Sequence, residues 1–156
     1  MNDIVILSAT RTPIGNFQGA YAATSAPRLG AAAIDGAAAA ARLAPADISD
    51  VLMGNVLQAG QGQAPARQAA LGAGLGLETP ATTLNTMCGS GLQSVVLARA
   101  LLQAGEAQVI VAGGMESMSN APFLMAKHRS GQKYGHDRLL DHMALDGLED
   151  AYEGLA

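Results

Sequence analysis

The sequence predicts an α/β fold in which a mostly parallel sheet carries helices on its faces. In the stretch 1–119, short runs rich in apolar and β-branched residues alternate with longer segments rich in alanine and leucine. Glycine or proline stands between most of these segments and marks the turns. Strands that alternate with helices at short spacing are typical of an open sheet built from parallel strands and crossover helices.

The first expected strand is Ile4–Ala9, a continuous apolar run that contains β-branched residues. Such a run is typical of a strand that is buried on both faces of a parallel sheet. Pro13 and Gly15 mark the turn that follows. Ser25 is a candidate N-cap for a helix over Arg28–Leu43, whose small side chains at helical spacing permit close approach to another element.

The second expected strand is Val51–Gln58, followed by a flexible loop over Gly60–Gln63 and a helix from Pro65 to about Leu75. The glycine-rich loop is not a phosphate-binding motif. It lacks the Gly-Lys-Ser/Thr of a P-loop, and no Gly-x-Gly-x-x-Gly follows a strand in the context that a dinucleotide site requires.

The third expected strand is the short run Thr82–Asn85, and a buried helix is expected over Leu92–Ala104. Gly105 is a good C-cap for that helix. The fourth strand, Gln108–Ala112, ends at two glycines. The carboxyl ends of these parallel strands are where open α/β sheets bind their ligands.

After Asn120 the sequence becomes more polar, and glycine and charged residues become frequent. We therefore expect two parts, a sheet domain over 1–119 and a separate layer over 120–156. The stretch Arg138–Ala156 is expected to include a short helix that ends near Glu153 and Gly154.

Cys88 is the only cysteine in the 156 residues, and it lies between the third expected strand and the following helix. A thiol at a helix N-terminus feels the positive end of the helix dipole, which favours the reactive thiolate. Nearby glycines allow close approach of a ligand, and first-turn N–H groups are free to stabilise an oxyanion. The alternative is an inert buried thiol. A nucleophile also needs a base partner, which the local pattern does not supply.

Composition and charge narrow the possible partners and locations. The formal net charge is −4 and no basic cluster follows the chain, so nucleic acid is not an expected partner. The one locally basic stretch, Lys127–Lys133, is interpreted as a solvated loop, with an interface role as the alternative. A single cysteine excludes an intrachain disulfide framework, and the chain start has no signal-peptide pattern. No apolar run reaches membrane-spanning length. These features predict a cytoplasmic protein that is not membrane-bound.

Four stretches of the sequence resemble thiolases, the family of acetyl-CoA acetyltransferases and 3-ketoacyl-CoA thiolases, and they occur in the family's order. The stretch around Cys88, Leu-Asn-Thr-Met-Cys-Gly-Ser-Gly-Leu-Gln-Ser, is similar to the family's acyl-enzyme segment. The other three are similar to the opening strand and turn, to the second strand with its loop, and to the strand end after the catalytic helix. The four stretches are Leu84–Ser94, Ile6–Gly15, Gly54–Gln68 and Ala112–Ser119.

The resemblance implies a thiolase-like layered fold and acyl transfer through a thioester on Cys88. The reaction would condense two acetyl-CoA to acetoacetyl-CoA or cleave a 3-ketoacyl-CoA with coenzyme A, as in fatty acid or polyhydroxyalkanoate metabolism. The Cys88 backbone N–H is the candidate oxyanion donor. Acyl-CoA is a substrate, and neither a permanently bound cofactor nor a metal is expected. The family also implies a homodimer or homotetramer, with 1–119 as the N-terminal thiolase domain and 120–156 as the beginning of the loop domain that helps to hold coenzyme A.

The sequence departs from the family pattern in one large respect. Thiolases are much longer, and their base lies in a Gly-His-Pro motif, their second catalytic cysteine in Cys-Gly-Gly-Gly and a third contributor in an Asn-Glu-Ala-Phe-like motif. None of these strings occurs here, and the three histidines, which lie in the polar tail, match none of them. An alternative is therefore a catalytically incomplete fragment or split subunit that needs a C-terminal half. Another condensing enzyme, such as a ketoacyl synthase, would share the fold and the cysteine, but the strings around Cys88 look like thiolase.

Several other residues carry both a functional and a structural interpretation. Arg11 could bind an anion or pair with a carboxylate. Glu116 follows the fourth strand, and we interpret it as an organiser of the Gly-Gly turn in preference to an acid/base. Met87, Met115 and Met118 are either adaptable packing around an acyl site or ordinary core residues.

Overall fold

A three-stranded parallel sheet forms the centre of the computed structural model, which describes residues 3–154. Its strands are β1 (Asp50–Gly54), β2 (Ala81–Leu84) and β3 (Ile110–Gly114), in the order β2-β1-β3. The central strand is in register with both neighbours, so Gly54 lies opposite Leu84 on one side and Gly114 on the other. The predicted α/β class with a parallel sheet is confirmed.

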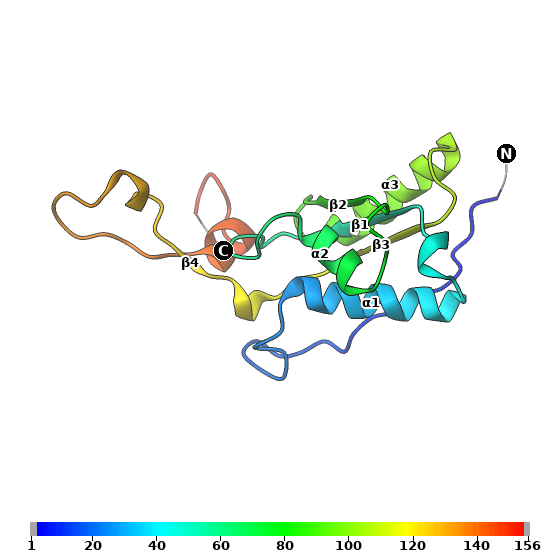
Figure 1. Ribbon diagram of the computed structural model, residues 1–156. Helices are drawn as coiled ribbons and strands as arrows, with labels where there is room; N and C mark the ends of the chain where they lie inside the picture. The colour runs from blue at the N-terminus through cyan, green and yellow to red at the C-terminus, as the bar shows by residue number, and fades with distance from the viewer. Residues whose placement is uncertain (1–2, 155–156) are drawn as a thin grey trace.

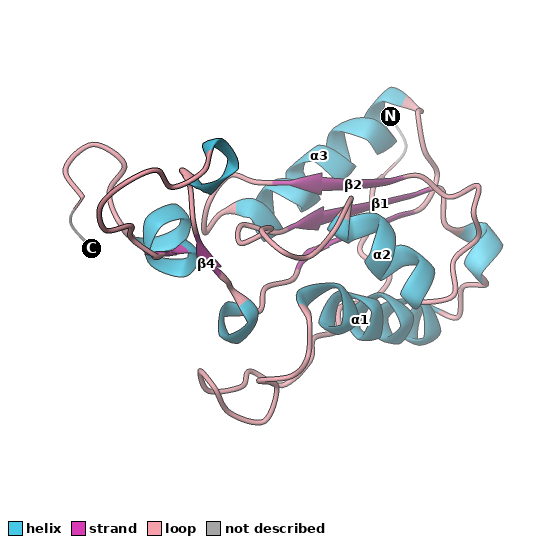
Figure 2. Ribbon diagram, turned by 60° about the vertical axis from the view of Figure 1, so that its left-hand side comes forward, coloured by secondary structure: helices cyan, strands magenta, loops and turns pink. Residues whose placement is uncertain are grey.

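Three helices cover the two faces of this sheet (Figure 1). They are α1 (Ala26–Ala41), α2 (Pro65–Gly72) and α3 (Ser90–Ala104). Figure 2 shows α3 on one side of the strands and α1 with α2 on the other. The chain passes from β1 through α2 to β2, and α3 then crosses back over β1 to reach β3.

A smaller unit follows the sheet along the chain. Strand β4 (Phe123–Leu124) pairs antiparallel with β5 (Leu140–Asp141), and the loop between them extends away from the sheet (Figure 1). A short helix is present after Arg138, but it is a five-residue π-helix, η4 (Ala144–Leu148), which ends before the predicted Glu153 and Gly154. Three 3-10 turns complete the regular structure: Pro45–Asp47, Met118–Asn120 and His128–Ser130.

The main hydrophobic core lies between the sheet and the α1–α2 layer. Val51 and Met53 of β1 are buried against Ile34 of α1 and Ala69 of α2. Small residues bring the two helices close together, since a Cβ added at Gly30 of α1 would lie 3.2 Å from the Ala69 Cβ. The small-residue spacing seen in the sequence is therefore a packing feature of this helix pair.

On the other face, the first turn of α3 rests directly on the ends of β1 and β3. A Cβ added at Gly54 would lie 2.5 Å from the carbonyl carbon of Ser90, and one added at Gly114 would lie 3.2 Å from the Gly91 Cα. Ser94 is fully buried and donates a hydrogen bond to the Gly113 carbonyl at 2.9 Å. These contacts set the position from which the chain enters α3.

The structure contradicts the prediction of a buried strand over Ile4–Ala9. This segment is extended but unpaired, and the side chains of Val5 and Ile6 are 66% and 82% exposed. It lies along α1, where the hydroxyls of Ser8 and Thr10 donate to the carbonyls of Ala37 and Ala33. The apolar run indicated an extended chain correctly, but its partner is a helix surface.

The prediction that the Leu92–Ala104 helix is buried is also wrong. α3 buries only the face that carries Ser90, Ser94 and Ala98, while Leu92 and Val96 are 72% and 54% exposed. The other predicted elements differ mainly in their ends. The second strand stops at Gly54, before the predicted Gln58, because the amides of Val56 and Leu57 donate to the Glu116 side chain and not to a neighbouring strand.

We predict that Gly54→Ala destabilises the fold by about 1–3 kcal/mol, the usual range for overpacking a tight contact. The added methyl group would meet backbone atoms of Ser90 and Gly91, which cannot rotate away as a side chain can. Urea unfolding monitored by circular dichroism measures the change.

The matched control is Gly36→Ala, within α1, where the nearest atom to an added Cβ is the Thr10 hydroxyl oxygen at 3.7 Å. This substitution is expected to stabilise the helix by about 0.5–1 kcal/mol, because alanine loses less backbone entropy on folding. A Gly54→Ala protein as stable as the parent would contradict the close approach of α3 to β1.

A second prediction concerns the pH dependence of stability at Asp50, the first residue of β1. Burial raises the pKa of this carboxyl group, and the hydrogen bond from the Val51 amide offsets part of the rise. A raised pKa means that the folded state favours the protonated form, so this contribution to stability is lost as pH rises through the folded-state pKa. Asp50→Asn is therefore expected to raise the melting temperature at pH 7, with the difference vanishing below the ordinary pKa of 3.8.

Asp150 provides a control of opposite sign. Hydrogen bonds from the amides of Glu153 and Tyr152 lower the pKa of its carboxyl group, so the ionised form is the one that the fold favours. Asp150→Asn should lower stability at pH 7, and this difference should vanish as the pH falls through the lowered pKa. If the melting temperature of each variant differed from that of the parent by the same amount at every pH, both pKa directions would be contradicted.

Candidate active site

The turn that presents Cys88 is held by two side chains on either side of it. The Asn85 side-chain oxygen accepts from the Met87 amide at 2.8 Å. The Ser90 hydroxyl, which is buried, accepts from the Thr86 amide at 2.9 Å and donates to the Met87 carbonyl. Met87 itself has a φ of 55°, in the left-handed region. Together these features reverse the chain sharply between β2 and α3.

Cys88 lies at the outside of this turn, and its side chain is exposed. Gly89 is the N-cap of α3, and its carbonyl accepts from the Gln93 amide at 2.8 Å to begin the helix. None of the three hydrogen bonds that hold the turn uses the Cys88 amide. The predicted location of the thiol, at the N-terminal end of a helix and beside the carboxyl ends of parallel strands, is the observed one, and the alternative of a buried thiol is wrong.

An open pocket of about 420 Å³ lies beside Cys88. The carboxyl ends of β1 and β3 contribute Gly54 and Gly114 to it, and η4 contributes Gly147 and Leu148 from the smaller unit. The remaining lining residues come from the Cys88 turn and α3 (Met87, Ser90, Gly91), the segment after β1 (Val56, Leu57) and the segment after β3 (Met115, Glu116, Met118). The pocket wall is mostly apolar, as is usual for a small-molecule site.

All three methionines for which the sequence left two interpretations line this pocket. Met115 belongs to the core as well and is 7% exposed, whereas Met118 is 41% exposed. Unbranched thioether side chains adapt to irregular shapes, so they suit the wall of a ligand pocket.

Glu116 organises the segment that follows β1. Its carboxylate accepts three hydrogen bonds: from the Asn55 side-chain amide at 2.7 Å, the Val56 amide at 2.8 Å and the Leu57 amide at 3.0 Å. Both carboxylate oxygens are therefore occupied. The structural interpretation of Glu116 is supported, but the segment it fixes is the Asn55–Leu57 loop, and the Gly-Gly turn is not among its contacts.

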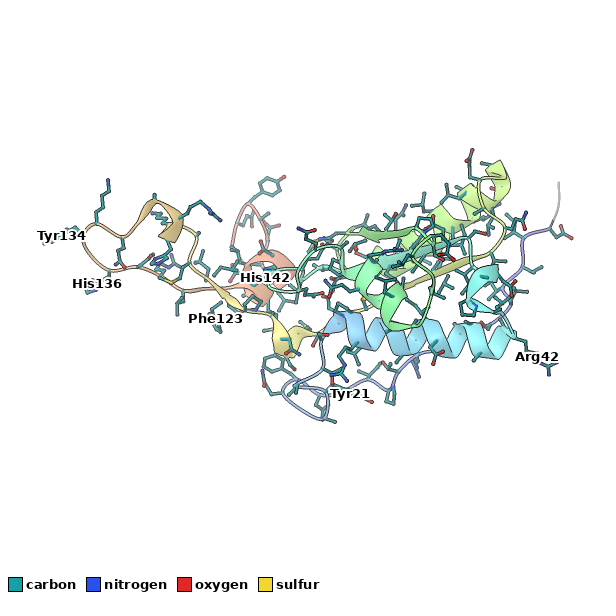
Figure 3. The ribbon with its side chains drawn as sticks, in the orientation of Figure 1. Tyr21, Arg42, Phe123, Tyr134, His136 and His142 are labelled. Atoms are coloured by element: carbon teal, nitrogen blue, oxygen red, sulfur yellow. The ribbon has the colours of Figure 1, made fainter. Side chains whose placement is uncertain are left out.

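The three histidines have different environments. His128 and His136 are exposed on the loop between β4 and β5, and Figure 3 shows His136 near its far end, beside Tyr134. His142, by contrast, is 5% exposed and lies close to η4. The expectation that all three lie in a polar tail is wrong for His142, which is buried. Within residues 3–154, no histidine lines the pocket beside Cys88.

Two arginines, Arg67 and Arg11, are not among the residues that line the pocket. Arg67 donates to the carbonyls of Leu77 and Thr79 and so holds the connection between α2 and β2. Arg11 is exposed. Over the described range no three histidine, cysteine or carboxylate side chains are grouped to hold a metal ion. No helix among residues 3–154 has the length and hydropathy to cross a membrane.

The fold and the site define a class: an α/β domain that presents a thiol from a tight strand-to-helix turn at the carboxyl end of a parallel sheet. The chain belongs to the thiolase family, since the model of the thiolase N-terminal domain matches residues 4–156. This finding confirms the resemblance that the motifs around Cys88 indicated, and it assigns the sequence to thiolases among the condensing enzymes.

Curated relatives share about half of their aligned residues with the chain. The mitochondrial acetyl-CoA acetyltransferase B of Xenopus laevis is 53% identical over 152 residues, which are 97% of this chain and 36% of the relative. The acetyl-CoA acetyltransferase of Schizosaccharomyces pombe is 48% identical over 98% of the chain and 39% of its own length. That of Cupriavidus necator is 49% identical over 97% of the chain and 39% of its own length. The chain thus spans little more than a third of the length of these relatives.

These names also correct the expected cytoplasmic location. Several relatives at 49% to 53% identity are named as mitochondrial. The expectation rested on the single cysteine and on the pattern at the start of the chain. One free thiol indicates only a setting in which disulfides do not form, so it does not distinguish between compartments of that kind.

We predict that Glu116→Gln destabilises the fold by about 1–3 kcal/mol, the range for leaving buried donors without an acceptor. Glutamine has one acceptor oxygen and cannot serve the amides of Val56 and Leu57 and the Asn55 side chain as the carboxylate does. Urea unfolding measures the loss, with Glu106→Gln, at an exposed position, as the matched control. Equal stability of the two variants would contradict the organising role.

Proposed function

We propose that this chain carries the nucleophile of a thiolase-type acyl transfer, with the Cys88 thiolate forming an acyl-thioester intermediate. The observation that carries the proposal is the exposed thiol at the start of α3, which opens into an apolar pocket at the carboxyl ends of β1 and β3. Family membership supports it, and so do the relatives, which are named acetyl-CoA acetyltransferases. The substrate would be an acyl-CoA, with coenzyme A as a substrate and no permanently bound cofactor.

The first chemical step transfers the acyl group to sulfur. The Cys88 thiolate attacks the carbonyl carbon of acetyl-CoA, the bond between that carbon and the coenzyme A sulfur breaks, and coenzyme A leaves as a thiolate that takes up a proton. The Cys88 amide, at the positive end of α3, is the proposed donor to the oxyanion of the tetrahedral intermediate. A thioester keeps the carbonyl reactive, so the acyl group can be passed on.

The second step forms a carbon–carbon bond. A base removes a proton from the α-carbon of a second acetyl-CoA, the carbanion attacks the Cys88 thioester, and the Cys88 thiolate leaves to give acetoacetyl-CoA. In the reverse direction, Cys88 attacks the ketone carbon of a 3-ketoacyl-CoA, the bond from that carbon to the α-carbon breaks, and acetyl-CoA leaves as a carbanion that takes up a proton. The shortened acyl group on Cys88 is then transferred to the thiolate of coenzyme A. Residues 120–156 are proposed as the beginning of the loop domain that contacts coenzyme A, since η4 already forms part of the pocket wall.

A second candidate is a catalytically incomplete thiolase part that needs a complementary C-terminal half. The composition of the pocket favours it. Among the described residues that line the pocket, Cys88 and Glu116 are the titratable ones, and both Glu116 oxygens already accept hydrogen bonds. The base for Cys88 and the acid/base for the carbanion step would then come from outside residues 3–154.

We also propose that the functional form is a homodimer or homotetramer. The support is the large amount of apolar surface on two segments, the stretch Ile4–Leu7 and the outer face of α3, where Leu92 and Val96 are exposed. Contiguous apolar surface of this kind is unusual on a monomer and marks contact with other protein. The Gly60–Gln63 loop and the basic stretch Lys127–Lys133 are candidate contact segments within such an assembly.

We predict that the parent protein gains one acetyl group on Cys88 when it is mixed with acetyl-CoA, and that Cys88→Ser gains none. The thiol is the only one in the chain, so an intact-mass spectrum followed by peptide mapping measures the result without ambiguity. Cys88→Ala controls for the fold, and its melting temperature should match the parent's because the side chain is exposed.

Equal labelling of the parent and Cys88→Ser would contradict the nucleophile assignment. A parent that is labelled only after addition of the complementary C-terminal part of a thiolase would support the second candidate. The 156-residue chain by itself is expected to make no acetoacetyl-CoA, and turnover by this chain free of longer polypeptides would contradict that expectation.

A further inference from the structure

We propose that His142 is a positioning residue of the Cys88 pocket, acting as a neutral imidazole that joins the loop after β1 to the π-helix η4. The inference rests on the proposed function for its catalytic consequence. The hydrogen bonds of His142 that support it do not depend on acyl transfer.

His142 makes two side-chain hydrogen bonds to different parts of the fold. Its Nε2 atom accepts from the Ala59 amide at 3.2 Å, across 83 residues of sequence, and its Nδ1 atom lies 2.6 Å from a carboxylate oxygen of Asp146. The ring is almost completely buried, with 5% of the residue exposed. Its own amide donates to the Pro122 carbonyl, which fixes the backbone that carries the ring.

These partners determine where the ring carries its proton. A backbone amide can only donate, so Nε2 must be the acceptor and carries no hydrogen. The proton of the neutral ring is therefore on Nδ1 and is donated to Asp146. Only a neutral imidazole in this tautomer satisfies both contacts, because a proton on Nε2 would oppose the Ala59 N–H.

The two partners of His142 lie next to residues that line the pocket beside Cys88. Ala59 follows Leu57 by two residues, and Asp146 directly precedes Gly147; Leu57 and Gly147 both line the pocket. They are also in contact with each other, since a Cβ added at Gly147 would lie 3.1 Å from a methyl carbon of Leu57.

Glu116 holds the near end of the same loop through Asn55, Val56 and Leu57, whereas the His142 ring holds its far end at Ala59. Without the His142 ring, the loop would remain tied to the sheet at Glu116 while η4 lost its polar connection to Ala59. The distance between this part of the pocket lining and the Cys88 turn would then no longer be set.

Two substitutions separate the two hydrogen bonds. Glutamine at position 142 can place an oxygen near the Nε2 position, so His142→Gln retains an acceptor for Ala59. Asparagine can place an N–H near Nδ1 but is too short to reach Ala59, so His142→Asn retains only the contact with Asp146. His136→Asn and His136→Gln, at an exposed position on the β4–β5 loop, are the matched controls (Figure 3).

The measurement is the rate at which Cys88 reacts with a small reagent, iodoacetamide, and with a bulky one, fluorescein maleimide. His142→Asn is expected to raise the ratio of the bulky to the small rate by about fivefold, the factor that loss of one hydrogen bond allows. His142→Gln is expected to stay near the parent ratio, and so are both His136 variants. Melting temperatures measured in parallel separate this effect from general destabilisation.

An unchanged ratio in His142→Asn, or equal ratios for His142→Asn and His142→Gln, would overturn the proposal. The ring's tautomer can also be measured in the parent protein by long-range ¹H–¹⁵N NMR, which needs no substitution. A proton on Nδ1 is expected, and a proton on Nε2 would overturn the proposal even if both variants failed to fold.

The same proteins mixed with acetyl-CoA distinguish this proposal from the proposed function. A shifted alkylation ratio in a protein that acetyl-CoA does not label, even after addition of the complementary C-terminal part of a thiolase, would support the positioning role and refute the acyl transfer. Labelling of the parent by acetyl-CoA together with an unchanged alkylation ratio in His142→Asn would support the acyl transfer and overturn the positioning role.

Discussion

The position of Cys88 depends on the contact between the first turn of α3 and the ends of β1 and β3. Glycines at 54, 91 and 114 remove the side chains that would separate the helix from the sheet, and the backbones meet directly. Ser94 adds a buried hydrogen bond from the next turn of the helix to the Gly113 carbonyl. Because the helix cannot shift along the sheet without a clash, the turn before it has a defined place above the strand ends.

Around that fixed turn, the pocket is assembled from segments that are held by polar side chains. Asn85 and Ser90 hold the Cys88 turn, Glu116 holds the loop after β1, and His142 connects that loop to η4. Each of these side chains satisfies backbone amides that regular strands and helices leave unpaired. Buried backbone donors need partners, and these side chains supply them in the irregular segments that form the pocket.

Many large apolar side chains of the protein are exposed and do not belong to the hydrophobic core. The segment Ile4–Leu7 and the outer face of α3 expose large aliphatic side chains, while the α1–α2 side is closed by small residues packed at short distance. Helix α3, which begins beside Cys88, packs one face on the sheet and exposes Leu92 and Val96 elsewhere on its surface. This exposed apolar surface suits contact with further protein. This asymmetry agrees with the low fraction of charged residues, 14% of the sequence.

Local periodicity, turn residues and short contiguous motifs were enough to predict the α/β class and the order of the central strands and helices. They also predicted the place of Cys88 between β2 and α3, and the family. It did not determine which apolar runs are covered. The Ile4–Ala9 segment and α3 have the composition of buried elements, yet burial depends on which surfaces meet in space.

Only the tertiary structure decided the roles of Glu116 and His142, since their partners lie 59 to 61 and 83 residues away along the chain. The one local indication in the sequence that the His142 ring is held in place is Asp146, four residues later. Hydrogen bonds between distant segments produce no periodic pattern in the sequence. The close approach of a helix to a sheet requires glycines at the contact, and these can be recognised in the sequence.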